Sequence, residues 1–397
     1  MDASTLLALR DPAGVPFYPV VFQALYILTW ALHAAFVFLS LGAMGLSLYG
    51  TMKQKTDSNW KILTPHLIQT GKISVSILIV LGVAPLLFTQ VIYDPNWYVA
   101  NTLSGMWVFT FIYTLIAGYV MYYWYYYANH AKEGGGKLIG FISFAILIFA
   151  GVMMHNFAVT SIMPNQWMEM YAPNGIVDTS GTTFNVDTIR LLFMFSLSIP
   201  VVGVFLQNYS RFISTREDFS TELKAYTASL GTKLGVYGLI LSALLFVAWM
   251  LQIGYLTNPI TIATVIGVVI LLIMIARNNN SYLTTIMLVI VALLISGVRE
   301  VIRYDIMSDL GYNIYDYTVN LEIPTITMFL LTFLIMGGVG VAYILTMAWK
   351  VGKTEGVFDG TKEPTVNRLA NYTISIMVVW MVVYFGWGMF TLFSNIL

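Results

Sequence analysis

The chain has 397 residues, of which 58% are hydrophobic and only 10% are charged, and its formal net charge is zero. A typical soluble domain carries about 25% charged residues, so this composition excludes an ordinary soluble enzyme. Cysteine is absent, which excludes disulfides, iron–sulfur clusters, thiolate ligation of haem and covalent attachment of c-type haem in this chain. The zero net charge gives no reason to expect nucleic acid as a partner.

Apolar runs of about 20 residues or more recur along the chain and predict membrane-spanning helices, because barrel strands would alternate instead. We therefore expect an all-α, polytopic transmembrane bundle of about ten spans. A polar stretch at 213–230 divides a five-span bundle, 1–212, from a second bundle, 231–397, and is interpreted as a cytoplasmic linker. The expected spans are 18–49, 63–92, 104–128, 138–162, 188–212, 231–255, 259–276, 282–304, 323–349 and 370–396.

Lysine and arginine gather in alternate loops. One set of loops carries most of these residues, whereas the opposite set carries acids such as Asp94, Glu169 and Asp187. Below, the two ends of the spans are called the basic end and the acidic end. The positive-inside rule places the basic end in the cytoplasm, so both termini are expected outside. The basic loops are 50–62, 129–137, 213–230, 277–281 and 350–369.

His33 lies near the middle of the first span, between Trp30 on one side and Phe36 on the other. Ionisable groups inside a membrane are rare and usually functional, and haem iron is the metal that best suits such a histidine. The alternative is a hydrogen bond to a neighbouring helix. The hydroxyl of Thr29 either accepts the N–H of the ring or bonds back to the carbonyl of Leu25.

Two other histidines, His155 and His66, are candidates as well, whereas His130 is not. His155 lies in the fourth span, four residues after Gly151, which leaves room for a flat macrocycle; the alternative is a packing glycine beside an interfacial histidine. His66 opens the second span at the basic end and either ligates a second haem or marks a helix start after Pro65. His130 follows the third span and is interpreted as solvated.

Three arginines depart from the positive-inside pattern, because Arg190, Arg299 and Arg303 fall at the acidic ends of the fifth and eighth spans. Arg299 and Arg303 are four residues apart and so share a helix face. The planar guanidinium suits carboxylates, and we expect these arginines to hold haem propionates or a quinone head group. The alternative partners are protein acids close in sequence: Asp187, Glu300 and Asp305.

The first spans resemble subunit I of the cytochrome bd quinol oxidases over about 210 residues. The resemblance rests on His33 followed by LSLGAMGLSL, Gly71-Lys72, Gly82-Val83, Asn96-Trp97 and the turn MPNQWMEM. It implies outward termini and haem ligation by the histidine of the first span. It also implies a respiratory complex in the cytoplasmic (inner) membrane of a bacterium or archaeon.

The chain departs from that family where oxygen is reduced. Its third span, TLSGMWVFTFIYTLIAG, lacks the glutamates that the family places beside the oxygen-reducing haem. Ile189 stands before Arg190 where the family usually has a histidine, and VREVIRYD stands where a Gly-Arg-Gln-Pro-Trp signature would be sought. The long hydrophilic quinol-binding loop is missing as well. We therefore expect no oxygen reduction.

These observations predict a haem-b-binding membrane subunit with one or two haems, His33 and His155 being the axial ligands. It would move electrons between a menaquinone or ubiquinone pool and a periplasmic partner, which is a c-type cytochrome or another oxidoreductase. One alternative is a haem-free anchor or quinone-binding scaffold, favoured by the missing histidine before Arg190. The other is an anion transporter, in which the arginines would bind substrate.

Overall fold

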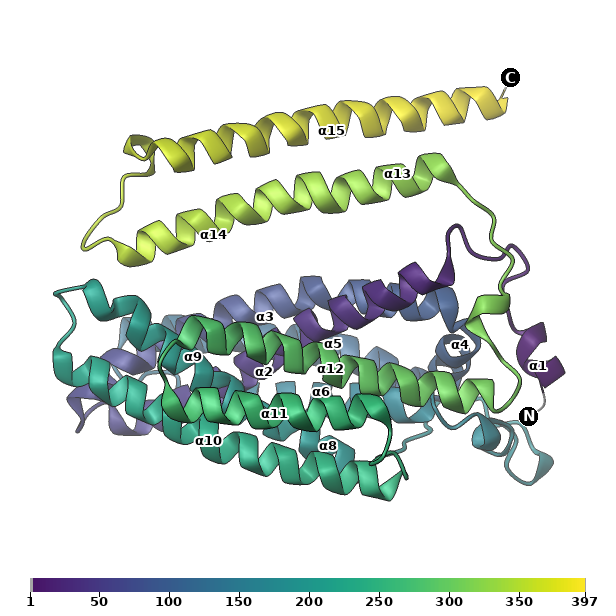
Figure 1. Ribbon diagram of the computed structural model, residues 1–397, viewed down its shortest axis with the longest axis horizontal. Helices are drawn as coiled ribbons and strands as arrows, with labels where there is room; N and C mark the ends of the chain where they lie inside the picture. Colours follow the sequence, from purple (N-terminus) through teal and green to yellow (C-terminus); the bar gives the residue numbers. More distant parts are fainter. Residues whose placement is uncertain (1–2, 397) are drawn as a thin grey trace. The chain divides into compact units, whose positions relative to one another are not determined.

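The computed structural model describes residues 3–396, which form helices joined by loops without a β-strand (Figure 1). Ten helical segments are long and apolar enough to cross a membrane, so the prediction of an all-α polytopic protein is confirmed. The spans consist of α2 (Pro19–Lys53), α3 (Ser58–Ile92), α5 (Gly105–Ala131), α6 (Lys137–Thr160), α8 with α9 (Thr188–Ser196 and Ser198–Phe212), α10 (Thr221–Gln252), α11 (Pro259–Arg277), α12 (Ser281–Ser308), α13 with α14 (Ile323–Leu331 and Gly338–Lys353) and α15 (Pro364–Ile396).

Contacts divide the chain into two compact units. The first contains residues up to 211 and 222–318, and the second contains 212–221 and the residues from 319 onward. This division differs from the expected one, because α10, α11 and α12 belong with the earlier spans; the role of 213–230 as a linker between functional halves stays a prediction. In the second unit, α13 and α14 form one rod antiparallel to α15, joined by a π-helical turn at Thr332–Gly337 (Figure 1).

The sixth span begins earlier than its hydropathy predicts. We expected it to start at residue 231, whereas α10 starts at Thr221. Its first turns are polar but not free of packing, because Leu223 and Thr227 are buried. Glu222 in the first turn also interacts favourably with the positive end of the helix dipole. A hydropathy window finds only the part of a helix that lies in the bilayer.

The helices α2 and α3 pack closely along their lengths, and α2 also contacts α6 and α12. Gly50 of α2 permits this, because a Cβ there would lie 2.2 Å from the Oγ1 of Thr64. The carboxylate of Asp57 caps α3 by accepting from the amides of Asn59 and Trp60, at 2.9 and 3.4 Å. A short helix, α4 (Asp94–Leu103), follows α3 at the acidic end.

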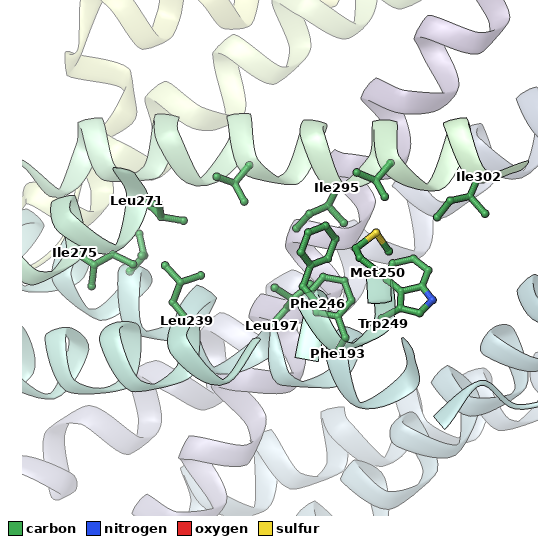
Figure 2. Close-up of a cluster of buried hydrophobic side chains, with 13 residues drawn as sticks. Phe193, Leu197, Leu239, Phe246, Trp249, Met250, Leu271, Ile275, Ile295 and Ile302 are labelled. Carbon is green, nitrogen blue, oxygen red and sulfur yellow. The ribbon is translucent and has the colours of Figure 1, made fainter. Parts of the chain in front are cut away.

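An aromatic cluster fixes α8 against α10 and α12. Figure 2 shows Phe193, Phe246 and Trp249 grouped beside Ile295 and Ile302. The ring of Phe193 lies 5.3 Å from that of Phe246 and 5.9 Å from that of Trp249. In a membrane such packing stabilises through close van der Waals contact, because lipid is as apolar as the side chains. The cluster thereby sets the positions of arginines on α8 and α12.

Candidate functional site

A cavity of about 460 Å³ lies inside the first unit, between α2, α3, α5, α6, α8 and α12. We call it the central cavity. Small-molecule sites usually measure roughly 300–1,000 Å³, so its size suits a cofactor. Of the residues predicted for the site, five line this cavity: His33, His155, Arg190, Arg299 and Arg303. Most of the remaining wall is aliphatic or aromatic.

His33 presents an open nitrogen to the central cavity. Its Nδ1 lies 2.8 Å from the carbonyl oxygen of Leu78 on α3. A carbonyl can only accept, so Nδ1 carries the proton and Nε2 keeps a free lone pair. Among residues 3–396, no side chain or backbone group donates to that Nε2. A histidine that binds a metal commonly has this arrangement, with its other N–H held by a carbonyl.

Two neighbours define the position of the ring. A Cβ at Gly82 would lie 2.8 Å from Cε1 of His33, so the absence of a side chain there makes room for the imidazole. Thr29 plays no part, because its hydroxyl donates to the carbonyl of Leu25 at 2.7 Å. The second of the two alternatives for Thr29 is therefore confirmed. The partner of the ring is instead a carbonyl on another helix.

Three residues of α2 line the cavity at successive helical turns. Tyr26, Trp30 and His33 are spaced by four and three residues and share one helix face. The guanidinium of Arg303 lies 4.7 Å from the ring of Tyr26, and that of Arg299 lies 3.9 Å from the ring of Trp30. At 1.5 Å per residue, His33 lies roughly 21 Å along α2 from its start at the acidic end. The cations are thus nearer to the acidic end than His33 is.

Arg190 and Arg303 are buried, Arg299 is half-buried, and all three are only partly paired. Arg190 and Arg303 are 6% and 8% exposed. Arg303 donates to the hydroxyl of Tyr26 at 3.0 Å and lies 3.5 Å from the carboxylate of Glu300. Arg190 contacts the face of Trp249 at 5.4 Å. Within the described chain the Nε atoms of all three arginines and Nη1 of Arg299 lack hydrogen-bond partners.

The central cavity therefore has excess positive charge. Its described lining contains three arginines and neither aspartate nor glutamate. Glu300 offsets one of these charges, whereas Asp305 accepts a hydrogen bond from Tyr255 and Asp187 caps α8. Buried cations that lack partners are unstable, so this end of the cavity favours an anionic ligand group. A separate void of about 10 Å³ lies among Arg190, Arg299 and Arg303, space for one water-sized group.

His155 lines the same cavity but differs in its hydrogen bonding. Its Nε2 accepts from the backbone amide of Asp187 at 3.2 Å, so the proton of the neutral ring is on Nδ1. Neither nitrogen then has a free lone pair. The ring lies near Arg190 and thus at the cationic end of the cavity. Gly151 also lines the cavity, although the ring of Phe195 takes part of the room that its missing side chain leaves.

The remaining predicted ligand, His66, is not among the residues that line the central cavity. It lies near the start of α3, at the basic end, where its ring is 5.5 Å from that of Tyr209. The sites at His33 and His66 are therefore separate places in the fold. A second haem at His66 stays a prediction.

A hydrogen-bond network behind the arginines was not expected from the sequence. Glu300 is 2% exposed, and its Oε1 accepts from the hydroxyl of Tyr93 at 2.7 Å and from Nε2 of Gln23 at 2.9 Å. Burial, followed by the charge of Glu300, raises the pKa of Tyr93 far above its usual value, so this phenol stays a donor. In the sequence, Gln23 is 277 residues and Tyr93 is 207 residues away from Glu300. No local sequence signal connects these three segments.

A second network lies at the acidic end, outside the spans. The buried carboxylate of Asp94 accepts from the hydroxyls of Tyr312 and Tyr317 and from the amide of Asp11. Burial raises the pKa of Asp94, although these hydrogen bonds act in the opposite direction. Arg10 stacks on the ring of Tyr312 at 4.2 Å. The network ties the segment before α2 to the segment after α12.

Comparisons with family models, with curated proteins and with solved structures yield no match. Within residues 3–396 there is also no group of three or more His, Asp or Glu side chains that could together hold a metal ion. Haem iron takes four ligands from its porphyrin, so it requires only one or two from the protein. The lone open nitrogen of His33 meets that smaller requirement.

Proposed function

We propose that this chain is a haem-b-binding membrane subunit that transfers electrons in a respiratory complex. The observation that carries the proposal is the central cavity itself, which joins an open imidazole nitrogen of His33 to a cluster of buried arginines. An amphiphilic cofactor with an apolar body, a metal centre and anionic groups at one edge matches those features. Haem b has that chemistry.

The residues present fit the group in three respects. His33 would bind iron through Nε2, and the carbonyl of Leu78 would hold the ring in the required tautomer. Arg299 and Arg190 have unpaired buried N–H groups that suit propionates. Aliphatic and aromatic side chains would cover the macrocycle and exclude water, which together with axial ligation tunes the reduction potential. When bound, haem supplies one-electron oxidation and reduction.

The partners follow from the orientation and from the family resemblance. The arginines of the cavity lie near the acidic end of the spans, which is the end with the acidic loops. The positive-inside rule places this end outside the cell. We propose that electrons pass between quinone in the bilayer and a c-type cytochrome or another periplasmic oxidoreductase on that side. The protein would lie in a bacterial or archaeal cytoplasmic membrane. The missing glutamates of the third span support electron transfer without oxygen reduction.

The test is a visible absorption spectrum of the full chain, purified in detergent from cells supplied with a haem precursor. We expect the reduced-minus-oxidised bands of a b-type haem and about one haem per chain by the pyridine haemochrome assay. His33→Ala should lose both, whereas His66→Ala should keep the haem of the central cavity. A wild-type protein that stays haem-free after reconstitution with added haemin would exclude the proposal.

One observation favours a second candidate. Three arginines without an acid in the described cavity wall would also suit an anionic substrate of an anion carrier. Uptake of radiolabelled carboxylates into proteoliposomes distinguishes the two functions, because transport needs no haem. A haem-free quinone-binding scaffold is the third possibility, and it predicts bound quinone in extracts of a protein that lacks the b-type spectrum.

A further inference from the structure

Glu300 is a buried acid that the proposed function leaves without a role. Its carboxylate does not line the central cavity, but it lies 3.5 Å from Arg303, which does. Both hydrogen bonds that it accepts go to Oε1, from Tyr93 and Gln23. Oε2 is buried and lacks a hydrogen-bond partner within the described chain, and it is the oxygen that lies 3.5 Å from Nη1 of Arg303. Within the described chain, Oε2 therefore has an ion pair with Arg303 but no hydrogen bond, so it has acceptor capacity that a proton could use.

Only one side chain separates Glu300 from a surface residue. The amide of Gln23 donates to Glu300, and its Oε1 accepts from the hydroxyl of Tyr315 at 2.6 Å. Tyr315 is 48% exposed and lies in the loop after α12, at the acidic end. Gln23 is half-buried near the start of α2. Gln23 is therefore the side chain that a proton would have to pass between Tyr315 and Glu300.

The groups around Glu300 are not expected to exchange a proton themselves. On its own helix, Arg299 and Arg303 remain charged because guanidinium does not deprotonate in proteins. After α3, Tyr93 is held protonated by burial and by the neighbouring carboxylate, which raise its pKa. Burial also raises the pKa of Tyr315 in the loop after α12. From α2, Tyr26 faces Arg303 rather than the carboxylate, and Gln23 carries no charge.

We propose that Glu300 exchanges a proton with water at the acidic end, past Gln23 and Tyr315, and so compensates charge that enters or leaves the central cavity. This inference rests on the proposed function, which makes that charge an electron. When one electron enters from a quinol or another reductant, Glu300 takes one proton from external water and becomes a neutral acid. When the electron leaves to an oxidant, Glu300 releases that proton, so the buried charge is unchanged.

Redox titration of the haem-loaded chain at a series of pH values tests the inference. One proton per electron lowers the midpoint potential by about 59 mV for each pH unit, because this is the value of a tenfold change for a one-electron couple. We expect the midpoint potential of the wild type to fall with rising pH at a slope that approaches this value. Glu300→Gln should be flat. Asp305→Asn, the matched acid on α12 that bonds to Tyr255, should keep the wild-type slope.

A second measurement does not depend on a folded Glu300 variant. Infrared difference spectra of the wild type should show a protonated carboxyl band that appears on reduction and shifts in D2O. Tyr93→Phe removes one bond to Oε1 and should move the frequency of this band. Tyr315→Phe should change the exchange rate of the band and leave its frequency nearly unchanged. Absence of the band would overturn the inference.

The outcomes separate the two proposals. A chain that binds no haem overturns the proposed function and this inference with it. A chain that binds haem, but whose midpoint potential has the same pH slope in the wild type and in Glu300→Gln, overturns only the role of Glu300. The slope is a readout that a purely structural carboxylate would not change.

Discussion

The two histidines of the central cavity make opposite kinds of hydrogen bond to their surroundings. On α2, His33 donates from Nδ1 to the carbonyl of Leu78 and keeps Nε2 open. On α6, His155 accepts at Nε2 from the amide of Asp187 and so has no free lone pair. Both residues are histidines in apolar spans that line the same cavity. The two rings therefore differ in their hydrogen-bond partners, and of the two only His33 keeps an acceptor nitrogen without a donor.

The two rings also lie at different levels of the cavity. His33 follows Trp30 by one turn, and Trp30 is the residue on which Arg299 stacks. His155 instead lies beside Arg190 and Asp187, at the cationic end. We infer separate roles for two parts of the cavity wall: the wall around His33 holds iron, and the wall around His155 surrounds anionic groups.

The largest effect is expected at His33. His33→Gly removes the proposed ligand and leaves a space beside Gly82 for an external base. Loss of a group that only supports a ligand costs roughly 10–100-fold in metal affinity, so loss of the ligand should exceed that range. Titration with haemin measures this affinity. Added imidazole should restore the b-type bands by occupying the vacated position.

A matched control is His66→Gly, which removes a histidine from the basic end, outside the cavity lining. Its haemin affinity should equal that of the wild type, and imidazole should have no effect on its spectrum. If His66→Gly instead lost half of the haem, a second haem would bind at that residue. If His33→Gly bound haemin as tightly as the wild type, the assignment of the iron wall would be wrong.

The next largest effect is expected at Arg299, with opposite signs in the two forms of the protein. Its Nε and Nη1 are buried without hydrogen-bond partners. Arg299→Met removes a charge whose Nε and Nη1 have no hydrogen-bond partner, so the haem-free variant should be more stable than the haem-free wild type. The same change removes charged hydrogen bonds to a propionate, each of about 1.5–3 kcal/mol, so haemin should bind more weakly.

Thermal unfolding with and without haemin measures both effects on Arg299→Met. The matched control is Arg211→Met, at the basic end of α9, where the guanidinium stacks on Tyr282 at 5.0 Å. It should leave haemin affinity unchanged. A loss of stability in haem-free Arg299→Met would mean that Arg299 is structurally compensated, and the cationic end would then need no anionic ligand.

Much of this arrangement could be predicted from the sequence, because it depends on local signals. Long apolar runs indicate the spans, and arginines at the acidic ends of spans, where the positive-inside pattern does not place them, indicate the cationic end of the cavity. The open nitrogen of His33 could not be predicted, since it depends on the carbonyl of Leu78, 45 residues away on another helix. The same holds for the bond from Asp187 to His155. The predicted start of the sixth span at residue 231 was wrong, because polar residues such as Glu222 extend α10 beyond its apolar part.

A smaller effect is expected at His155. His155→Ala removes one hydrogen bond to the amide of Asp187, which is worth about 0.5–1.5 kcal/mol. Haemin affinity should fall by roughly tenfold or less, and the b-type spectrum should remain. Electron paramagnetic resonance of the wild type and the variant measures the ligation state. Loss of a low-spin signal in the variant would show that His155 is a second ligand, and the contrast between the walls would fail.

The smallest effect is expected at Asp94, which lies on neither wall and tests whether the loops at the acidic end act independently. Because burial raises its pKa, the folded protein favours the protonated acid, and the stability from this group decreases as pH rises through the folded pKa. This window opens just above the ordinary aspartate value of about 3.9. Asp94→Asn should remove that contribution and flatten the dependence of the melting temperature on pH.

The amide oxygen of Asp94→Asn can still accept from Tyr312 and Tyr317, whose pKa values are raised so that both remain donors. Haemin affinity should stay at the wild-type value, because a network outside the spans controls the fold of the loops and not the ligand of the iron. Parallel pH profiles for the two proteins would show instead that Asp94 is ionised in the folded state.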